Sequence, residues 1–238
     1  TTMLADHIGA VLLERIVYYR GNLEQVAMLM TSQWGDTLYW LWRMLRTVGR
    51  IAFPIYCFLL VEGFLHTRDW RRYWLRMAAF ALISEIPFRL AVWNTWAGGS
   101  SNVYVELAIG LLVLRGLKQS EGLTQPRRAA GMAAVIGGGC LAAVFLKADY
   151  DMDGILIISL FYLLREKRIV QVMSGGILSL LESWNMCYGA GILSAVPLYF
   201  YNGKKGQAPW KYAFYWFYPL HLMVLFFIRL YVVGIPLG

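Results

Sequence analysis

The feature that most constrains the fold of this chain is a series of apolar runs, each close to the length that crosses a bilayer. A transmembrane helix needs about 20 mostly apolar residues, and short polar segments separate the runs. Only 15% of the residues are charged and 59% are hydrophobic, whereas about 25% of a soluble domain is charged. The sequence therefore predicts an all-α, polytopic helical membrane protein with about eight or nine transmembrane helices in one bundle.

No segment between the runs has the composition of a linker, so a single transmembrane domain accounts for residues 1–238. The chain begins inside an apolar run, and we expect the first helix to be truncated at its N-terminal end. Residues 152–201 also fit two long helices and a re-entrant piece. The spans are expected near Thr1–Tyr19, Leu41–Leu65, Trp74–Trp93, Val103–Leu117, Ala129–Leu146, Met152–Leu164, Ile169–Ser183, Tyr188–Tyr201 and Tyr212–Val233.

Lysine and arginine concentrate in alternate connections between these spans. The basic residues of the second, fourth, sixth and eighth connections are Arg68, Arg71, Arg72, Arg76, Lys118, Arg127, Arg128, Arg165, Lys167, Arg168, Lys204, Lys205 and Lys211. Cytoplasmic connections carry such an excess, so the even connections and the start of the chain are predicted to be cytoplasmic. The net charge of +8 forms no single basic patch, so membrane lipid is the expected surrounding and nucleic acid is not an expected partner.

No metal site is expected from the sequence. Cys57, Cys140 and Cys187 lie in or beside apolar runs without the spacing of metal ligands, and we interpret them as small buried hydrophobic residues. The acidic stretch ADYDMDG suggests a cation-binding loop, but it lacks the length and the later glutamate of a calcium loop.

Ionisable residues inside the apolar runs are the main functional signal. A charge at the bilayer centre costs about 2.5–3.5 kcal/mol on insertion scales, so such groups usually face one another or a wet cavity. We therefore expect them to converge inside the bundle. The residues concerned are Asp6, His7, Arg46, Arg50, Glu62, Glu85, Arg89, Glu106, Glu182 and His221.

The second run, GRIAFPIYCFLLVEGFLHT, begins with an arginine and contains a proline. Arg43, Arg46 and Arg50 share one helix face, because they are three and four residues apart. Pro54 lacks a backbone N–H and frees a carbonyl near Arg50 from its normal partner. Inside a membrane such a kink needs neighbouring groups or a cavity to satisfy the backbone. A second pairing of an ionisable residue with a proline occurs at Glu85 in LISEIPFRL.

The predicted topology places His7, Arg50, Glu85 and His221 near the midplane or in the outer half of the membrane, with Glu62 and His66 toward the cytoplasm. His7 has the strongest functional interpretation, because an imidazole can take a proton from an amine or a hydroxyl and return it near neutral pH. His221 would serve instead or assist. Arg50 is always protonated and would hold a carbonyl oxygen, a carboxylate or a phosphate.

Each of these residues also has a structural interpretation without chemistry. The alternatives are a polar pair of Asp6 and His7 that fixes one helix to another, a buried ion pair of Arg50 and Glu85, and an interfacial helix end at Glu62 and His66. Buried ion pairs often specify packing alone, so the sequence leaves these alternatives open.

Four blocks of the sequence, ADHIGAV, GRIAFPIYCFLLVEGFLHT, ALISEIPF and FYPLHLMV, resemble the TraX family of membrane proteins and follow one another in the family's order. The resemblance implies a protein of the bacterial cytoplasmic membrane, associated with N-terminal acetylation of conjugative pilin subunits. It also implies acetyl-CoA as the donor and a distant similarity to transmembrane acyltransferases that use an intramembrane histidine. The residues that match the family's blocks are Asp6, His7, Arg50, Pro54, Glu62, Glu85 and His221.

From the residues and the resemblance together, we expect a membrane acetyltransferase. His7 is the expected base, oriented by Asp6 or Glu85, with Arg50 at the carbonyl oxygen and His221 as a further catalytic group. The residues expected to bind acetyl-CoA are Arg46, Glu62, His66, Arg68, Arg71 and Arg72. The positive-inside rule explains the last three arginines equally well.

Two other classes of protein remain open at this stage. Intramembrane histidine, glutamate and arginine with broken helices also occur in proton-coupled or solute-coupled transporters. A non-catalytic assembly protein would use the same groups to hold helices together. For an enzyme, the acceptor is an amine, on a peptide or a small molecule, and a homodimer is compatible with the sequence.

Overall fold

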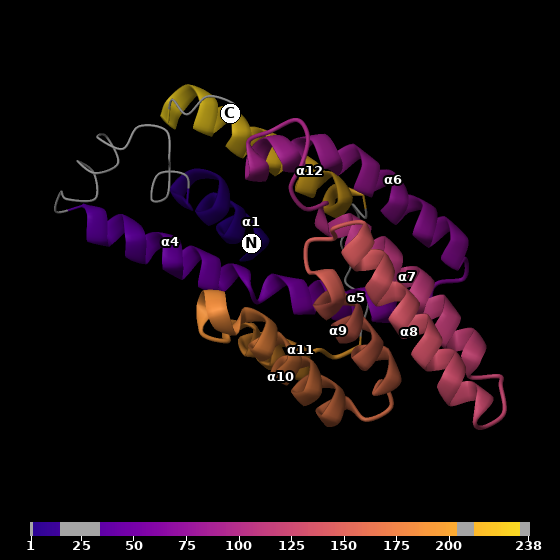
Figure 1. Cartoon of the computed structure of the whole chain (residues 1–238). Coiled ribbons are helices and arrows are strands. Elements are labelled where there is room, and N and C mark those ends of the chain that lie inside the picture. The colour runs from indigo at the N-terminus through magenta and orange to yellow at the C-terminus, as the bar shows by residue number, and fades with distance from the viewer. Residues whose placement is uncertain (1, 15–33, 204–211, 234–238) are drawn as a thin grey trace.

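The computed structural model describes residues 2–14, 34–203 and 212–233, and within these ranges the chain is helical and has no strand. Figure 1 shows the helices packed side by side, with α1 and α4 at one end of the molecule and the α7–α8 connection at the other. The prediction of an all-α protein is confirmed.

Most elements are α-helices, and short π-helical or 3₁₀ segments adjoin several of them. In chain order they are α1 Thr2–Ile8 with η1 Gly9–Leu13, α4 Gly35–Gly49, α5 Ala52–His66, α6 Trp70–Phe88 with η2 Arg89–Trp93, α7 Val103–Ser120, α8 Arg127–Phe145, α9 Asp151–Leu163, α10 Arg168–Cys187, η3 Ala190–Ser194 with α11 Ala195–Tyr199, and α12 Ala213–Ile228 with η4 Arg229–Val233.

Every predicted span contains helix within the described residues, but not every helix is long and apolar enough to cross a bilayer. In the part of the chain that the structure describes, three helices meet both criteria, Gly35–His66, Arg127–Phe145 and Ala213–Tyr231. Residues 152–201 form α9, α10 and the short pieces η3 and α11, which pack on α10. The predicted alternative of two long helices and a re-entrant piece agrees with this in having two helices and a separate short segment, and the re-entrant path of that segment stays a prediction.

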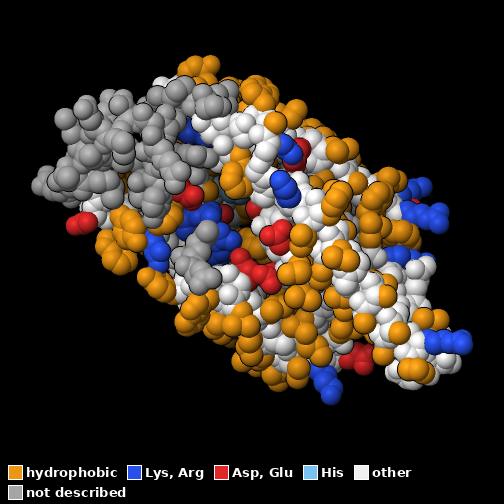
Figure 2. Space-filling view, viewed as in Figure 1, with side chains coloured by type: hydrophobic (Ala, Val, Ile, Leu, Met, Phe, Trp, Pro, Cys, Tyr) orange, Lys and Arg blue, Asp and Glu red, His pale blue; other side chains and the backbone are white. Residues whose placement is uncertain are grey.

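The outer faces of several helices are apolar. Leu82 and Ile86 on α6, and Leu141 and Phe145 on α8, are all more than half exposed. Figure 2 shows hydrophobic side chains over most of the face that it presents. Surfaces of this kind are stable in hydrocarbon rather than in water. The chain is a helical membrane protein.

The chain bends between α4 and α5, where the sequence predicts a kink. The amide of Arg50 still donates to the Arg46 carbonyl at 3.2 Å, but the amide of Ile51 turns to the Val48 carbonyl at 3.4 Å. Pro54 lies in the first turn of α5, where a missing N–H is tolerated. The bend lets α4 leave the bundle next to α1 (Figure 1).

Two connections on one side of the bundle are tied together by hydrogen bonds. The amide of Ser101 donates to the Lys147 carbonyl at 2.7 Å, and its hydroxyl donates to the Leu146 carbonyl at 2.8 Å. The Ser100 hydroxyl reaches the Asp149 carboxylate at 3.4 Å. The predicted topology puts both connections on the outer side of the membrane, and in the structure they form one wall of the cavity described below.

Candidate functional site

A polar cavity of about 870 Å³ lies between α1, α4 and the two tied connections. Figure 2 shows acidic and basic side chains gathered around a hollow on this face. The polar and charged residues that line the cavity are Asp6, His7, Glu14, Arg46, Arg50, Ser100, Lys147, Asp149, Tyr150, Asp151 and Glu182. A cavity of this size and chemistry can hold a ligand and water together.

His7, which lines this cavity, forms a hydrogen-bonded pair with His221. Nδ1 of His7 lies 2.6 Å from Nε2 of His221, and Nδ1 of His221 lies 2.5 Å from the carbonyl oxygen of Phe217. The two residues are 8% and 7% exposed. Since a carbonyl only accepts, Nδ1 of His221 carries a proton and, in the neutral ring, Nε2 accepts the proton of His7 Nδ1.

This chain of hydrogen bonds leaves the lone pair of His7 on Nε2. Within the described residues no hydrogen bond involves Nε2 of His7, and His7 lines the cavity. An imidazole fixed in this tautomer by its other nitrogen is arranged as a general base. The arrangement can remove a proton from a group that enters the cavity.

The local structure of α12 explains why His221 is held in place. Pro219 lies inside α12 and has no N–H to give to the carbonyl of Tyr215, one turn earlier. The hydroxyl of Tyr104 donates to that carbonyl at 3.3 Å instead. The ring of Tyr218 packs edge-on against His7, with 5.6 Å between centroids. Tyr104 of the neighbouring α7 therefore provides the carbonyl of Tyr215 with a hydrogen-bond donor and also packs against Tyr218, which contacts His7.

The close approach of α1 to α4 brings the acidic residue beside His7 to an arginine. A Cβ at Gly49 would lie 2.2 Å from the Cβ of Asp6, so only glycine fits there. Asp6 pairs with Arg46 at 2.9 Å, and Arg46 also lies 3.6 Å from Glu14. Asp6 is thus engaged by Arg46, and the partner that orients His7 is His221.

Arg50 faces the same cavity from the bend after α4. Its guanidinium lies 3.5 Å from the Glu182 carboxylate and 5.7 Å from the centre of the Tyr150 ring. A guanidinium inside a cavity of low dielectric interacts strongly with an anion or with a developing oxyanion. Arg46 and Arg50 therefore bring two guanidinium groups to the cavity, each next to a carboxylate that also lines it.

The opposite wall comes from the connection between α8 and α9, which the sequence did not single out as part of the site. Asp149 is exposed to the cavity, yet the surrounding protein desolvates its carboxylate and raises its pKa from 3.8 to about 6, an effect that Arg50 opposes. Tyr150 stacks flat on Phe53, with centroids 3.4 Å apart. The available signal was the stretch ADYDMDG, whose acidity suggested only a cation loop.

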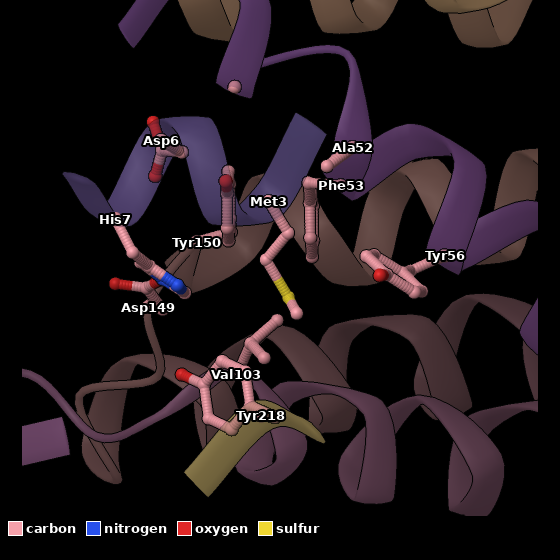
Figure 3. A pocket seen from close by; sticks show the side chains of 11 residues that line it. Met3, Asp6, His7, Ala52, Phe53, Tyr56, Val103, Asp149, Tyr150 and Tyr218 are labelled. Atoms are coloured by element: carbon pink, nitrogen blue, oxygen red, sulfur yellow. The ribbon is translucent and has the colours of Figure 1, made fainter. Parts of the chain in front are cut away.

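A second, narrow pocket of about 40 Å³ adjoins the large cavity and shares His7 with it. Figure 3 shows the side chains around it, which come from α1, α5, α7, α12 and the α8–α9 connection. Its other walls combine the carboxylates of Asp6 and Asp149 with aliphatic and aromatic side chains, among them Met3, Phe53 and Val103. His7 therefore lines both the large polar cavity and this smaller pocket of mixed lining.

The structure brings some of the predicted site residues together and separates others. Asp6, His7, Arg46 and Arg50 line the cavity, and His221 contacts His7 behind it. Glu85 is elsewhere: its carboxylate accepts from Arg89 at 2.8 Å and from the Asn102 amide at 2.6 Å. The residues placed at the far end of α5 and the start of α6 are Glu62, His66, Arg68, Arg71 and Arg72.

Comparison with known proteins gives one family and one relative. The model of the family described as TraX protein matches residues 1–229. A curated protein named probable fimbrial assembly protein FimC, serogroup H1, of Dichelobacter nodosus is 29% identical, over 86% of this chain and 88% of its own length. No solved structure matches.

Proposed function

The chain belongs to the TraX family, and we propose that it is an integral membrane acetyltransferase that moves the acetyl group of acetyl-CoA to an amine. The observation that carries this proposal is the hydrogen-bonded chain from the Phe217 carbonyl through His221 to His7, which leaves Nε2 of His7 as a base at the cavity. The resemblance of the sequence to this family supplies the donor and the reaction class.

In the proposed reaction, the nitrogen of a neutral amine bonds to the carbonyl carbon of the acetyl thioester. Nε2 of His7 accepts the proton that the nitrogen loses, while His221 stabilises the charge through its bond to Nδ1. The carbon–sulfur bond then breaks, and the proton passes from His7 to the leaving sulfur. The products are an acetylated amine and free CoA thiol.

Arg50 would stabilise the negative charge that develops on the carbonyl oxygen during this attack. It lines the cavity that His7 also lines, and it is charged at every relevant pH. Groups that stabilise a developing oxyanion typically contribute a factor of about 10²–10³ to kcat. Arg46 adds a second guanidinium group at the cavity and pairs with Asp6 at 2.9 Å.

The acceptor is proposed to be an amine on a peptide or a small molecule. Asp149 and Asp151 line the cavity and would attract the ammonium form of such an amine before it loses its proton. The relative of Dichelobacter nodosus is named a probable fimbrial assembly protein, which supports the free N-terminus of a pilin-like subunit as the acceptor and a role in assembling or modifying such subunits.

We further propose a multi-pass protein of the bacterial inner membrane with a cytoplasmic N-terminus. In this orientation, the exposed arginines Arg68, Arg71 and Arg72 face the cytoplasm, where acetyl-CoA is made. They would attract its phosphates, while the thioester reaches His7 near the other end of α5.

Purified protein with labelled acetyl-CoA tests the proposal. We would follow thiol release and search amines and peptides for an added acetyl group by mass. His7→Ala is expected to lower kcat by about 10²–10⁴, and His221→Ala by less, because it orients the base rather than touching the substrate. His66→Ala tests the predicted donor site instead: His66 is exposed and bonds to the carbonyl of Glu62, so its loss is expected to change the KM for acetyl-CoA and leave kcat close to that of the wild type.

Equal turnover by His7→Ala and wild type would contradict the assignment of the base. Absence of both binding and turnover in folded wild-type protein would favour transport or assembly. A cavity of about 870 Å³ lined by charged groups is also what a solute pathway requires, so flux into liposomes separates the transporter from the assembly protein.

A further inference from the structure

The narrow pocket beside His7 has the size of a small acyl group. Its volume is about 40 Å³, against about 870 Å³ for the large cavity. The pocket therefore suits a group of a few non-hydrogen atoms, such as an acetyl group, rather than a long chain. It shares Asp6, His7, Asp149 and Tyr150 with the large cavity, so a group seated in it would lie against the proposed base.

Packed aromatic rings hold the walls of this pocket in place. Phe53 is 3% exposed and stacks on Tyr150, with centroids 3.4 Å apart. The ring of Tyr218 packs edge-on against both His7 and Tyr104, with centroid separations of 5.6 and 5.1 Å. Since interiors of this kind are close-packed, the pocket cannot widen without moving several rings at once.

One flexible side chain occupies part of the space between these rings. Figure 3 shows the thioether of Met3 reaching from α1 into the pocket, toward Val103. Methionine is unbranched and adapts its shape more readily than the aromatic walls. Met3 is therefore the side chain that limits how far a group can extend beyond the space next to His7.

We propose that this acyl pocket, formed by Met3, Phe53, Tyr56 and Val103, seats the acyl group of the donor and restricts it to two or three unbranched carbons. The inference rests on the proposed function. During transfer the amine nitrogen bonds to the carbonyl carbon as the carbon–sulfur bond breaks, so the alkyl end of the acyl group does not react and only has to fit. One methylene too many in an apolar pocket changes kcat/KM by about 10–200-fold.

The test compares acetyl-, propionyl-, butyryl- and hexanoyl-CoA with one amine acceptor in the wild type and in variants of the full chain. For the wild type we expect similar kcat/KM with acetyl and propionyl, because Met3 can shift. We expect a loss of about tenfold or more with butyryl. Met3→Ala removes three non-hydrogen atoms and is expected to raise the butyryl-to-acetyl ratio at least about tenfold.

Met173→Ala is the matched control, because it removes the same atoms from an exposed position on α10, away from the pocket. It is expected to keep the wild-type preference among the four donors. Val103→Ala provides a second variant with a smaller enlargement, and a smaller shift in the same direction is expected. If Met3→Ala does not fold, Val103→Ala alone carries the comparison with the wild type.

The outcomes separate this inference from the proposed function. Equal transfer from all four donors by the wild type overturns the acyl pocket but leaves acyl transfer in place. An unchanged preference in folded Met3→Ala or, if that variant does not fold, in Val103→Ala overturns it as well. No transfer from any donor by folded wild-type protein overturns the proposed function, and the acyl pocket with it.

Discussion

Two groups of arginines flank α5, and they have opposite surroundings. Arg46 and Arg50 precede it and face the cavity, where the Arg46 side chain is 11% exposed and pairs with Asp6. Arg68, Arg71 and Arg72 follow it and are exposed, and Arg72 is 82% exposed in its pair with Asp69. The two groups are separated by the length of α5, about 22 Å at a rise of about 1.5 Å per residue.

The two groups differ in how strongly their charge acts on a nearby anion, because burial changes the dielectric around the guanidinium. An exposed arginine is hydrated and screened, so it attracts anions weakly and mainly orients the chain in the membrane. An arginine in a protein cavity acts through a lower dielectric, so its effect on a nearby charge is several times larger. The arginines of the cavity are therefore the candidates for chemistry, and those of the connection are candidates for attracting the donor.

Replacing Arg50 tests the cavity side of this comparison most directly. Arg50→Ala is expected to lower kcat by about 10²–10³, because the developing oxyanion loses its stabilising charge. Arg50→Lys keeps the charge but not the planar fork, so it should recover only part of the rate. Acetyl transfer assayed at saturating donor measures both. A loss confined to KM would show that Arg50 binds substrate without stabilising the transition state.

The ion pairs of the two groups should differ in their contribution to stability. Arg46→Ala leaves the partly buried Asp6, whose side chain is 17% exposed, without its arginine. We expect this to destabilise the protein by about 2–3 kcal/mol, below the range for fully buried pairs, because the cavity is polar. Arg72→Ala breaks an exposed pair and should cost about 0–1 kcal/mol. Thermal unfolding of both variants in the same detergent measures the two losses of stability. Equal losses would contradict the difference expected between a cavity ion pair and an exposed one.

The exposed arginines should affect donor binding and not the chemical step. The combined change of Arg68, Arg71 and Arg72 to glutamine is expected to raise the KM for acetyl-CoA by up to about tenfold with kcat unchanged, because exposed charge contacts contribute about 0–1 kcal/mol each. The effect should shrink as salt is added. The control is the combined change of Arg127 and Arg128, in another basic connection, to glutamine. A fall in kcat would place the arginines closer to the reaction.

The smallest expected effect comes from Asp149, on the wall opposite the cavity arginines. Its pKa is raised from 3.8 to about 6, chiefly by desolvation, so the folded protein binds this proton more tightly than the unfolded chain. Stability should therefore fall as the pH rises from about 4 to about 6. Asp149→Asn should show a flatter profile of melting temperature over this range. A profile identical to that of the wild type would contradict the shift.

The positions of the helices could be predicted from the sequence, because apolar length is a local property. The nine predicted spans each contain helix, and the predicted kink is present as a bend between α4 and α5, just before Pro54. The number of helices that cross the membrane could not be predicted in the same way. Within the described residues, three helices are long and apolar enough to cross a membrane. Residues 190–199 form short segments that pack on α10.

Some residues of the candidate site, among them Asp6, His7 and Arg50, could be predicted from the sequence, but their contacts could not. His7 and His221 are 214 residues apart, and sequence features gave each a chemical role without showing that they touch. Asp6 and Glu85 were expected to orient His7, yet Asp6 pairs with Arg46 and Glu85 accepts from Arg89 and Asn102. Adjacent residues on a helix point about 100° apart, so sequence neighbours such as Asp6 and His7 face different partners.

The sequence by itself determined an all-helical membrane protein of the TraX family, with ionisable residues inside apolar runs. Hydrophobic length and the cost of burying charge act at the level of single segments, so they can be read along the chain. Which charged groups lie together follows only from the packing of the helices, which also adds Asp149 and Tyr150 to them. The same packing forms the pocket of about 40 Å³ beside His7. Those features depend on the packing of α1, α5, α7 and α12 with the α8–α9 connection, and no single segment contains that information.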